Sequence, residues 1–336
     1  MFQKKGIYYY KNLITTQKTL KFNNNSMFSV IFPGQGSQSV SMAKELHDNF
    51  AYVKDLFKAA DEVLGYSISK IILDGPKEDL DLTENTQPAI FLASYSIFEM
   101  VKKESNINLN KAKYFAGHSL GEYSALAACN ALDFQSAIKL LNERGKAMQA
   151  AVPKGVGGML AVLGAEINEI QNLLEENKND YKCYIANDNS NGQIVLSGLN
   201  SDIDKFIDTL KTKKIKNIKL PVSAPFHCKL MDKATTIMRD KINNTNFEKP
   251  KNVIISNVTG SETQEIDKIK DLLIKQIESP VRWRESVIYM IKNGVTNFIE
   301  IGPGKVLSGL VKRIDKTINV NTINKPEDLK DIKPND

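Results

Sequence analysis

Hydrophobic and polar residues follow two different periods along the chain, and these predict strands that alternate with helices. Residues 28–34 (FSVIFPG) form an apolar run that ends in Pro-Gly, as in a buried strand, and residues 41–65 have the period of a helix that stops at Gly65. A second helix is predicted after Pro88, and a second strand, 113–117, leads through a turn into a helix that reaches Ala128. Residues 297–304 repeat the buried strand near the C-terminus. The alternation predicts a parallel sheet with helices on both faces.

The pattern changes between about Gly155 and Val222. Short apolar runs at 157–164, 182–198 and 217–223 are separated by two polar stretches with helical character. Their order is close to β-α-β-β-α-β, which is ferredoxin-like. We therefore predict an α/β fold in which a ferredoxin-like subdomain, residues 154–223, is inserted into a large hydrolase-like domain made of residues 27–153 and 224–320.

Composition narrows the class of protein. Of the 336 residues, 42% are apolar and 25% are charged, as in ordinary globular proteins, and no apolar run of about 18 residues is present to span a bilayer. We therefore expect a soluble protein with no membrane partner. The cysteines are far apart, odd in number and in no C-x-x-C pair, so we expect neither disulfides nor a metal site, and a reducing, cytoplasmic compartment.

The positive charge is unevenly distributed. The formal net charge is +6, but residues 1–26 contain five lysines and no acidic residue. Because the excess belongs mostly to this segment, it does not predict a nucleic-acid partner. We interpret residues 1–26 either as a basic leader, which would be organellar if it is a transit peptide, or as a misassigned start before Met27. The segment is set apart from the predicted fold.

A Gly-x-Ser-x-Gly motif carries the first indication of chemistry. Residues 117–121 (GHSLG) place Ser119 between a predicted strand and a predicted helix, which is typical of a nucleophilic serine on a sharp turn. Backbone N–H groups at the start of the helix could then hold an oxyanion. A tight turn built from small residues for packing alone is the alternative.

A serine nucleophile needs a base, and the chain contains three histidines. His47 is predicted on a solvated helix face, and His118 adjoins the serine, where the turn directs successive side chains apart. His227 follows the serine in chain order, as in proteins with this elbow, and lies in a loop shaped by Pro225. We therefore predict His227 as the base, with a structural loop histidine as the alternative. No carboxylate stands out as a third member.

Arg144 falls on the apolar stripe of a predicted helix. An arginine that points inward needs an anion, and its planar fork pairs well with a carboxylate. The alternatives are a side chain that reaches out to solvent or an ion pair within the protein. The stripe consists of Phe134, Ala137, Ile138, Leu141, Gly145 and Met148.

Several polar residues are weaker candidates. Residues 32–38 (FPGQGSQ) form a turn directly after a strand, and a backbone N–H there could join the oxyanion site. Gln87, Asn187 and Gln276 taken singly look like ordinary hydrogen-bonding residues at loops or strand ends.

Seven segments in this order resemble the malonyl-CoA:acyl-carrier-protein transacylases of fatty-acid synthesis, over about residues 28–314. The segments are FPGQGSQ, TENTQPA, GHSLGEYSAL, NERGKAMQ, SAPFHC, SPVRW and IEIGPGKVLSGLVKR. The resemblance implies Ser119 as nucleophile, His227 as base and Arg144 as the clamp of the malonyl carboxylate. It also implies that the backbone N–H groups of Gln35 and Leu120 form the oxyanion hole and that the backbone carbonyl of Gln276 orients His227. Gln87 and, more weakly, Asn187 are the implied residues of the acyl pocket.

The resemblance also implies the partners. Malonyl-CoA and acyl carrier protein are the expected substrates of a ping-pong reaction, by a monomer without metal or redox cofactor. A serine thioesterase, a polyketide acyltransferase acting in trans and a non-catalytic carrier-binding protein are the alternatives. Because carriers are acidic, we expect a basic patch near the cleft, with four candidate residues: Lys213, Lys214, Lys216 and Lys229.

Overall fold

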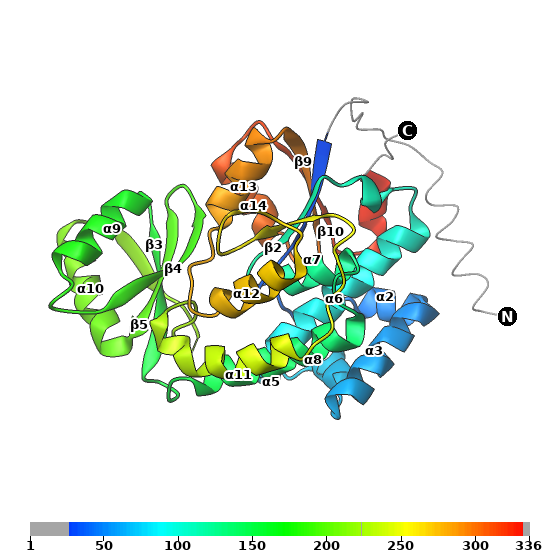
Figure 1. Ribbon diagram of the computed structural model, residues 1–336, viewed down its shortest axis with the longest axis horizontal. Coiled ribbons are helices and arrows are strands. Elements are labelled where there is room, and N and C mark those ends of the chain that lie inside the picture. Colours follow the sequence, from blue (N-terminus) through cyan, green and yellow to red (C-terminus); the bar gives the residue numbers. More distant parts are fainter. Residues whose placement is uncertain (1–26, 223, 332–336) are drawn as a thin grey trace.

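The computed structural model describes residues 27–222 and 224–331, so the segment 1–26 lies outside the described residues. Figure 1 shows a larger lobe and, on the left, a smaller lobe that contains β3, β4 and β5. The larger lobe is built on a six-stranded sheet in the order β10-β9-β1-β2-β7-β8, in which every neighbouring pair is parallel except β7 and β8. The strands are β1 (Met27–Phe32), β2 (Tyr114–Gly117), β7 (Val253–Ser256), β8 (Ser261–Thr263), β9 (Val295–Ile301) and β10 (Asn319–Ile323).

Helices cover both faces of this sheet, which explains the continuous apolar runs of its central strands. Ile31 of β1 packs in one cluster with α13 (Trp283–Lys292) and α14 (Val306–Ile314). Phe32, the next residue, packs on the opposite side with α6 (Thr83–Glu104), α7 (Gly121–Ala128) and α8 (Phe134–Ala150). The other helices are α2 (Lys44–Asn49), α3 (Ala51–Leu64), α4 (Ile68–Asp74), α5 (Lys77–Leu80), α11 (Asp232–Asn243) and α12 (Ile266–Gln276), with the 3-10 turns η1 (Leu109–Lys111), η2 (Lys229–Met231) and η3 (Pro326–Asp331).

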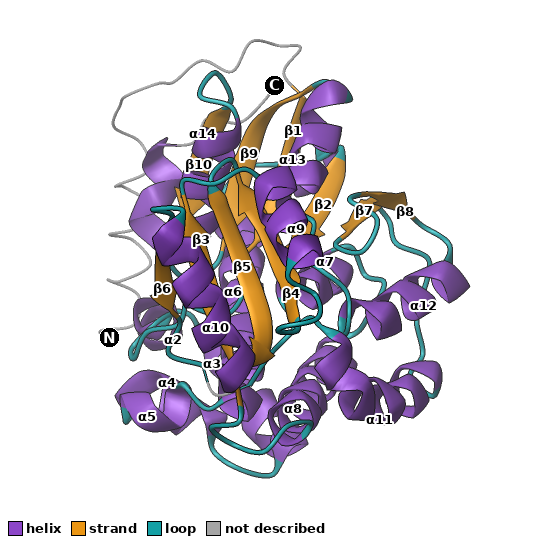
Figure 2. Ribbon diagram, turned by 90° about the vertical axis from the view of Figure 1, so that its left-hand side faces the viewer, coloured by secondary structure: helices purple, strands orange, loops and turns teal. Residues whose placement is uncertain are grey.

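The smaller lobe is an antiparallel sheet in the order β4-β5-β3-β6 with its own apolar core. Figure 2 shows α9 and α10 on the outer face of this sheet. The chain order and the strand order together are those of a ferredoxin-like fold. The predicted fold class, a parallel-sheet domain with an inserted ferredoxin-like subdomain, is therefore confirmed. The elements are β3 (Gly157–Leu163), α9 (Ile167–Glu176), β4 (Cys183–Ser190), β5 (Gln193–Leu199), α10 (Asn200–Thr212) and β6 (Lys216–Lys219).

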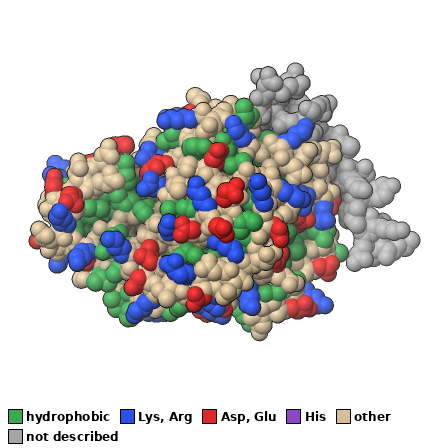
Figure 3. All heavy atoms as spheres, viewed as in Figure 1, with side chains coloured by type: hydrophobic (Ala, Val, Ile, Leu, Met, Phe, Trp, Pro, Cys, Tyr) green, Lys and Arg blue, Asp and Glu red, His purple; other side chains and the backbone are tan. Residues whose placement is uncertain are grey.

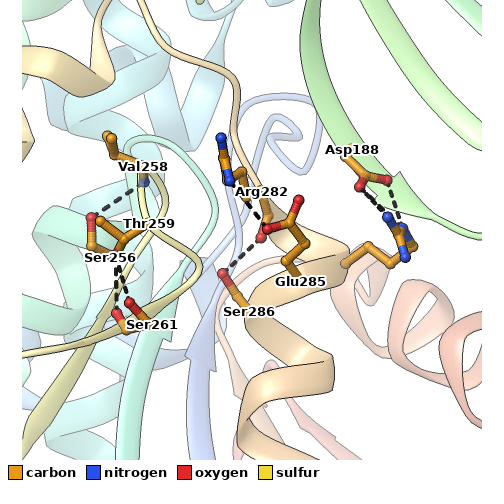
Figure 4. A network of polar contacts seen from close by, with 9 residues as sticks. Asp188, Ser256, Val258, Thr259, Ser261, Arg282, Glu285 and Ser286 are labelled. Atoms are coloured by element: carbon orange, nitrogen blue, oxygen red, sulfur yellow. Dashed lines mark hydrogen bonds and ion pairs between the residues drawn. The ribbon is translucent and has the colours of Figure 1, made fainter. Parts of the chain in front are cut away.

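Strand β4 joins the smaller lobe to the larger one. Its Asn187 forms a parallel β-bridge with Val281, in the segment before α13. The next residue, Asp188, accepts three hydrogen bonds of 2.8–3.0 Å from the guanidinium of Arg284 on α13. Figure 4 shows this carboxylate together with the polar contacts of Arg282, the residue before α13, and of Glu285 and Ser286 in α13. Since Asp188 is buried and the pair is bidentate, this contact joins the two lobes firmly.

Two predicted helices differ from the observed ones. The helix predicted over 41–65 is two helices, because Phe50 between them is extended at φ −120° and ψ 118°. The helix predicted after Pro88 begins at Thr83 instead, with the proline inside it. Proline leaves the carbonyl four residues earlier without its usual donor, and the side chain of Asn142 donates to that Glu84 carbonyl at 3.0 Å.

No helix among the described residues is long and apolar enough to cross a membrane.

Candidate active site

Ser119 lies at the tip of a strained turn between β2 and α7. Its φ of 53° is in the left-handed region, which is uncommon for a residue other than glycine. The two glycines of the motif allow the turn to pack tightly. A Cβ on Gly117 would come within 2.0 Å of the Gly121 backbone, and one on Gly121 would come within 2.4 Å of the Phe32 carbonyl oxygen. The motif is therefore a sharp elbow held against the end of β1.

His227 lies directly opposite the serine. Its Nε2 is 2.8 Å from Ser119 Oγ, and its Nδ1 is 2.9 Å from the backbone carbonyl oxygen of Gln276. A carbonyl can only accept, so Nδ1 carries the proton and Nε2 accepts the serine hydroxyl hydrogen. The imidazole is thus held in the tautomer that a general base requires, with a carbonyl in the place of a triad carboxylate.

Burial and charge keep His227 neutral. The side chain is 4% exposed, and desolvation, together with the nearby positive charge of Arg144, lowers the pKa of the imidazole to about 3. At neutral pH the lone pair on Nε2 is therefore available to take the proton of Ser119.

Arg144 reaches the same site from α8 and is 1% exposed. It donates to Gln87 Oε1 at 2.7 Å, to Gln276 Oε1 at 2.8 Å and to Ser119 Oγ at 3.2 Å. The guanidinium also lies over the ring of Tyr123, 5.7 Å from its centroid. The arginine therefore points inward, beside the nucleophile, and does not extend to solvent.

Three polar candidates, which the sequence placed at loops or strand ends, lie within regular elements. Gln87 is inside α6, Asn187 is in β4, and Gln276 is the last residue of α12. Gln87 and Gln276 both contact Arg144, whereas no hydrogen bond among the described residues joins the Asn187 side chain to Ser119 or Arg144.

The backbone N–H groups of Gln35 and Leu120, the expected oxyanion hole, belong to two neighbouring turns. The register of β1 and β2 brings Phe32 opposite Gly117, so the turns that follow the two strands are neighbours. A Cβ on Gly34 would touch the His118 carbonyl oxygen at 2.5 Å, which shows how closely the turns approach. Within residues 27–222 and 224–331, no group accepts a hydrogen bond from either N–H.

Two residues of the site were missed from the sequence, Glu122 and Asn257. The Asn257 side chain accepts from the Ser119 N–H and donates to the Gly117 carbonyl, both at 2.7 Å, so it holds both sides of the elbow. Glu122 is 2% exposed and accepts from Gln276 Nε2 at 2.7 Å and from the Asn257 N–H at 3.0 Å. Glu122 follows the motif directly, which was a signal, but nothing in the sequence marks Asn257.

Three of the four candidate lysines lie away from the His227 loop. Lys216 pairs with Leu163 at one end of β3, whereas Gly157 at the other end lies against Pro225. Lys213 and Lys214 stand three and two residues before Lys216, so they share its end of the lobe. Lys229 is exposed and two residues from His227. On the face shown in Figure 3, basic and acidic side chains are mixed, without a large area of one sign.

Among the described residues, no group of three or more His, Cys, Asp or Glu side chains is arranged to hold a metal ion.

Burial also shifts the pKa values of other titratable groups around the nucleophile. Desolvation lowers the pKa of His118 and raises the pKa of Tyr123 to about 12.

The α/β fold with an elbow serine, a neutral histidine and a buried arginine defines a serine-dependent acyltransferase or a close relative of one. Residues 29–327 match the family model of the acyl transferase domain, and the chain belongs to this family. The malonyl CoA-acyl carrier protein transacylase of Bacillus subtilis is 40% identical over 306 residues, which cover 90% of this chain and 95% of the relative.

Solved structures agree with this assignment. The acyl-carrier-protein-S-malonyltransferase of Bartonella henselae is 38% identical and superimposes with a TM-score of 0.88, covering 90% of this chain and 97% of that one. A malonyl-transacylase solved in complex with a type II PKS acyl-carrier protein is 36% identical, with a TM-score of 0.86 and coverage of 90% and 98%.

Proposed function

We propose that this protein transfers the malonyl group from malonyl-CoA to the phosphopantetheine thiol of acyl carrier protein. The observation that supports this most directly is the position of Arg144. Its guanidinium is fully buried and donates to the nucleophile oxygen at 3.2 Å, so a carboxylate at the end of a short acyl chain on Ser119 would lie within its reach. The names of the relatives support the same substrates.

The first half of the reaction forms a seryl ester. His227 Nε2 takes the proton of Ser119 as Oγ attacks the thioester carbonyl, and the N–H groups of Gln35 and Leu120 stabilise the oxyanion. Collapse of the tetrahedral intermediate breaks the C–S bond, and the proton on His227 passes to the departing thiolate. The products are malonyl-Ser119 and free coenzyme A.

The second half reverses these steps with a different thiol. The carrier's pantetheine sulfur gives its proton to His227 and attacks the ester carbonyl. Collapse of the tetrahedral intermediate then breaks the ester C–O bond, and the proton returns to Ser119 Oγ. The reaction is therefore ping-pong. Since a thiol has a pKa of about 8.5, it leaves or attacks without a strong acid, which fits a site with a carbonyl in place of a triad carboxylate.

Two acceptors fit the site. A carrier of type II fatty-acid synthesis is the proposed one, and the structural relative solved with a polyketide carrier makes that carrier the second candidate. We further propose a cytoplasmic monomer that needs no metal or redox cofactor. Size exclusion of the purified protein tests whether it is a monomer. Activity after dialysis against a chelator tests whether it works without a metal.

The reaction is tested by the intact mass of the protein after incubation with malonyl-CoA alone. We expect one malonyl adduct, which disappears when a carrier with a free pantetheine thiol is added. Ser119→Ala is the matched control, because alanine suits the turn and lacks the nucleophile. An adduct on Ser119→Ala would contradict the assignment of the nucleophile. An adduct that water removes as fast as the carrier does would indicate a hydrolase.

A further inference from the structure

Glu122 is a buried carboxylate that the proposed reaction does not use. It lies in the first turn of α7, three residues after the nucleophile, and only 2% of its surface is exposed. Its Oε2 accepts hydrogen bonds from Gln276 Nε2 at 2.7 Å and from the Asn257 N–H at 3.0 Å. A buried carboxylate of this kind is costly unless a nearby positive charge compensates it.

The guanidinium of Arg144 has the complementary need. Each of its hydrogen bonds within the described residues goes to a neutral oxygen, from Gln87, Gln276 or Ser119. The Gln276 amide connects the two charges, because its oxygen accepts from Arg144 at 2.8 Å while its nitrogen donates to Glu122 at 2.7 Å. The amide dipole is thus oriented with its negative end toward the cation and its positive end toward the carboxylate.

We propose that Glu122 is the resting counter-charge of Arg144, coupled to it through the Gln276 side chain, and that an acyl carboxylate bound to Arg144 drives Glu122 to its neutral form. This inference rests on the proposed function, in which Arg144 holds the malonyl carboxylate. In that state two carboxylates would share one buried guanidinium. Like charges in one buried site cannot both stay ionised without a large cost, so one of them takes up a proton.

Among Glu122 and the titratable groups that face it, Glu122 is the one that changes charge near neutral pH. Burial raises the pKa of the Glu122 carboxyl to about 7. The pKa of His227 is lowered to about 3 and that of Tyr123 is raised to about 12, so both side chains are neutral there, and Arg144 stays charged. His118, whose pKa burial also lowers, is neutral at and above pH 7.

Uptake of a proton on loading has a measurable consequence. By linkage, malonyl loading becomes less favourable as the pH rises through the pKa of Glu122, because the proton that loading requires becomes scarcer. Acetyl loading introduces no carboxylate and needs no such proton. With both thioesters in one sample, we expect the ratio of malonyl adduct to acetyl adduct to fall about tenfold between pH 6.5 and pH 9. Uptake of one proton can change this ratio by at most about tenfold per pH unit, so the expected fall is within that limit.

The experiment compares three proteins by intact mass across this pH range. In Glu122→Gln the amide oxygen can still accept from Gln276 and Asn257, but the charge is gone, so the adduct ratio should not vary with pH. Glu300→Gln is the matched control, because Glu300 is also buried, and its hydrogen bonds go to Leu307 and Ser308 of α14 and not to Ser119, Arg144 or Gln276. It should keep the wild-type pH dependence. A ratio that is independent of pH in the wild type, or equally dependent in Glu122→Gln, overturns the proposal.

A second measurement on the wild type covers the case in which Glu122→Gln fails to fold. A pH indicator in weakly buffered solution at pH 7.5 should report proton uptake when malonyl-CoA loads the enzyme, and none when acetyl-CoA does. Equal signals from the two thioesters overturn the coupling. Failure of the proposed function is distinguishable, because malonyl-CoA would then form no adduct on Ser119 at all.

Discussion

Substitution of Arg144 by alanine tests the clamp that selects the acyl group. The side chain is 1% exposed, so its charge is removed from solvent. Loss of one partner from a desolvated charge pair costs about 2–4 kcal/mol. If the malonyl carboxylate is the partner, Arg144→Ala should lower kcat/KM for malonyl-CoA by about 30- to 1,000-fold. Acetyl-CoA lacks the carboxylate, so its kcat/KM should change far less.

Stability is expected to fall in the same variant for a separate reason. Without the guanidinium, the side-chain oxygens of Gln87 and Gln276 lose their donor in a buried site, which costs about 1–3 kcal/mol for each group left unpaired. The ratio of the two kcat/KM values is therefore the informative quantity, because it cancels any loss of folded protein.

The assay consists of initial rates with the two thioesters and one thermal melt. Arg284→Ala serves as the control, since this arginine pairs with Asp188 at the junction of the lobes and contacts neither Ser119 nor His227. It should lower the melting temperature with little change in the malonyl-to-acetyl ratio. Equal losses for malonyl and acetyl in Arg144→Ala would show that Arg144 is a structural residue and would refute the clamp.

Three further predictions follow from the geometry. Because the pKa of His227 is lowered to about 3, the rate of acetyl loading should stay nearly constant from pH 7 to pH 5. The rate can be measured by stopped-flow detection of the coenzyme A that is released. A decline in the rate centred near pH 6.5 would show that His227 titrates as an ordinary imidazole. Lys229→Glu should raise the KM for the carrier and make this KM depend less on salt. Lys216→Glu, at the end of β6 that lies away from the His227 loop, should change neither quantity. Identical effects of the two substitutions would contradict docking of the carrier beside the His227 loop. Gly121→Ala should prevent folding, because its Cβ would meet the Phe32 carbonyl oxygen at 2.4 Å, whereas Gly309→Ala, with open space around it, should fold as the wild type does by circular dichroism.

The sequence by itself determined the features that depend on neighbouring residues. Alternating apolar runs predict the parallel sheet because strands covered on both faces have no polar side. The Gly-x-Ser-x-Gly spacing predicts the elbow because only glycine fits at its two ends, and the apolar stripe of α8 predicts that Arg144 points inward.

Tertiary structure alone decided which distant residues complete the site. Asn257 holds the elbow across 138 positions of sequence, and Gln276 reaches Glu122 across 154. Neither amide differs in its sequence surroundings from a solvated one, so sequence context assigned Gln276 to a loop and passed over Asn257. Gln87 was misjudged likewise, because the donation of Asn142 to the Glu84 carbonyl lets a helix run through Pro88. A hydrogen bond depends on the positions of two atoms, and for segments this far apart only the packing of β7, α7 and α12 sets those positions.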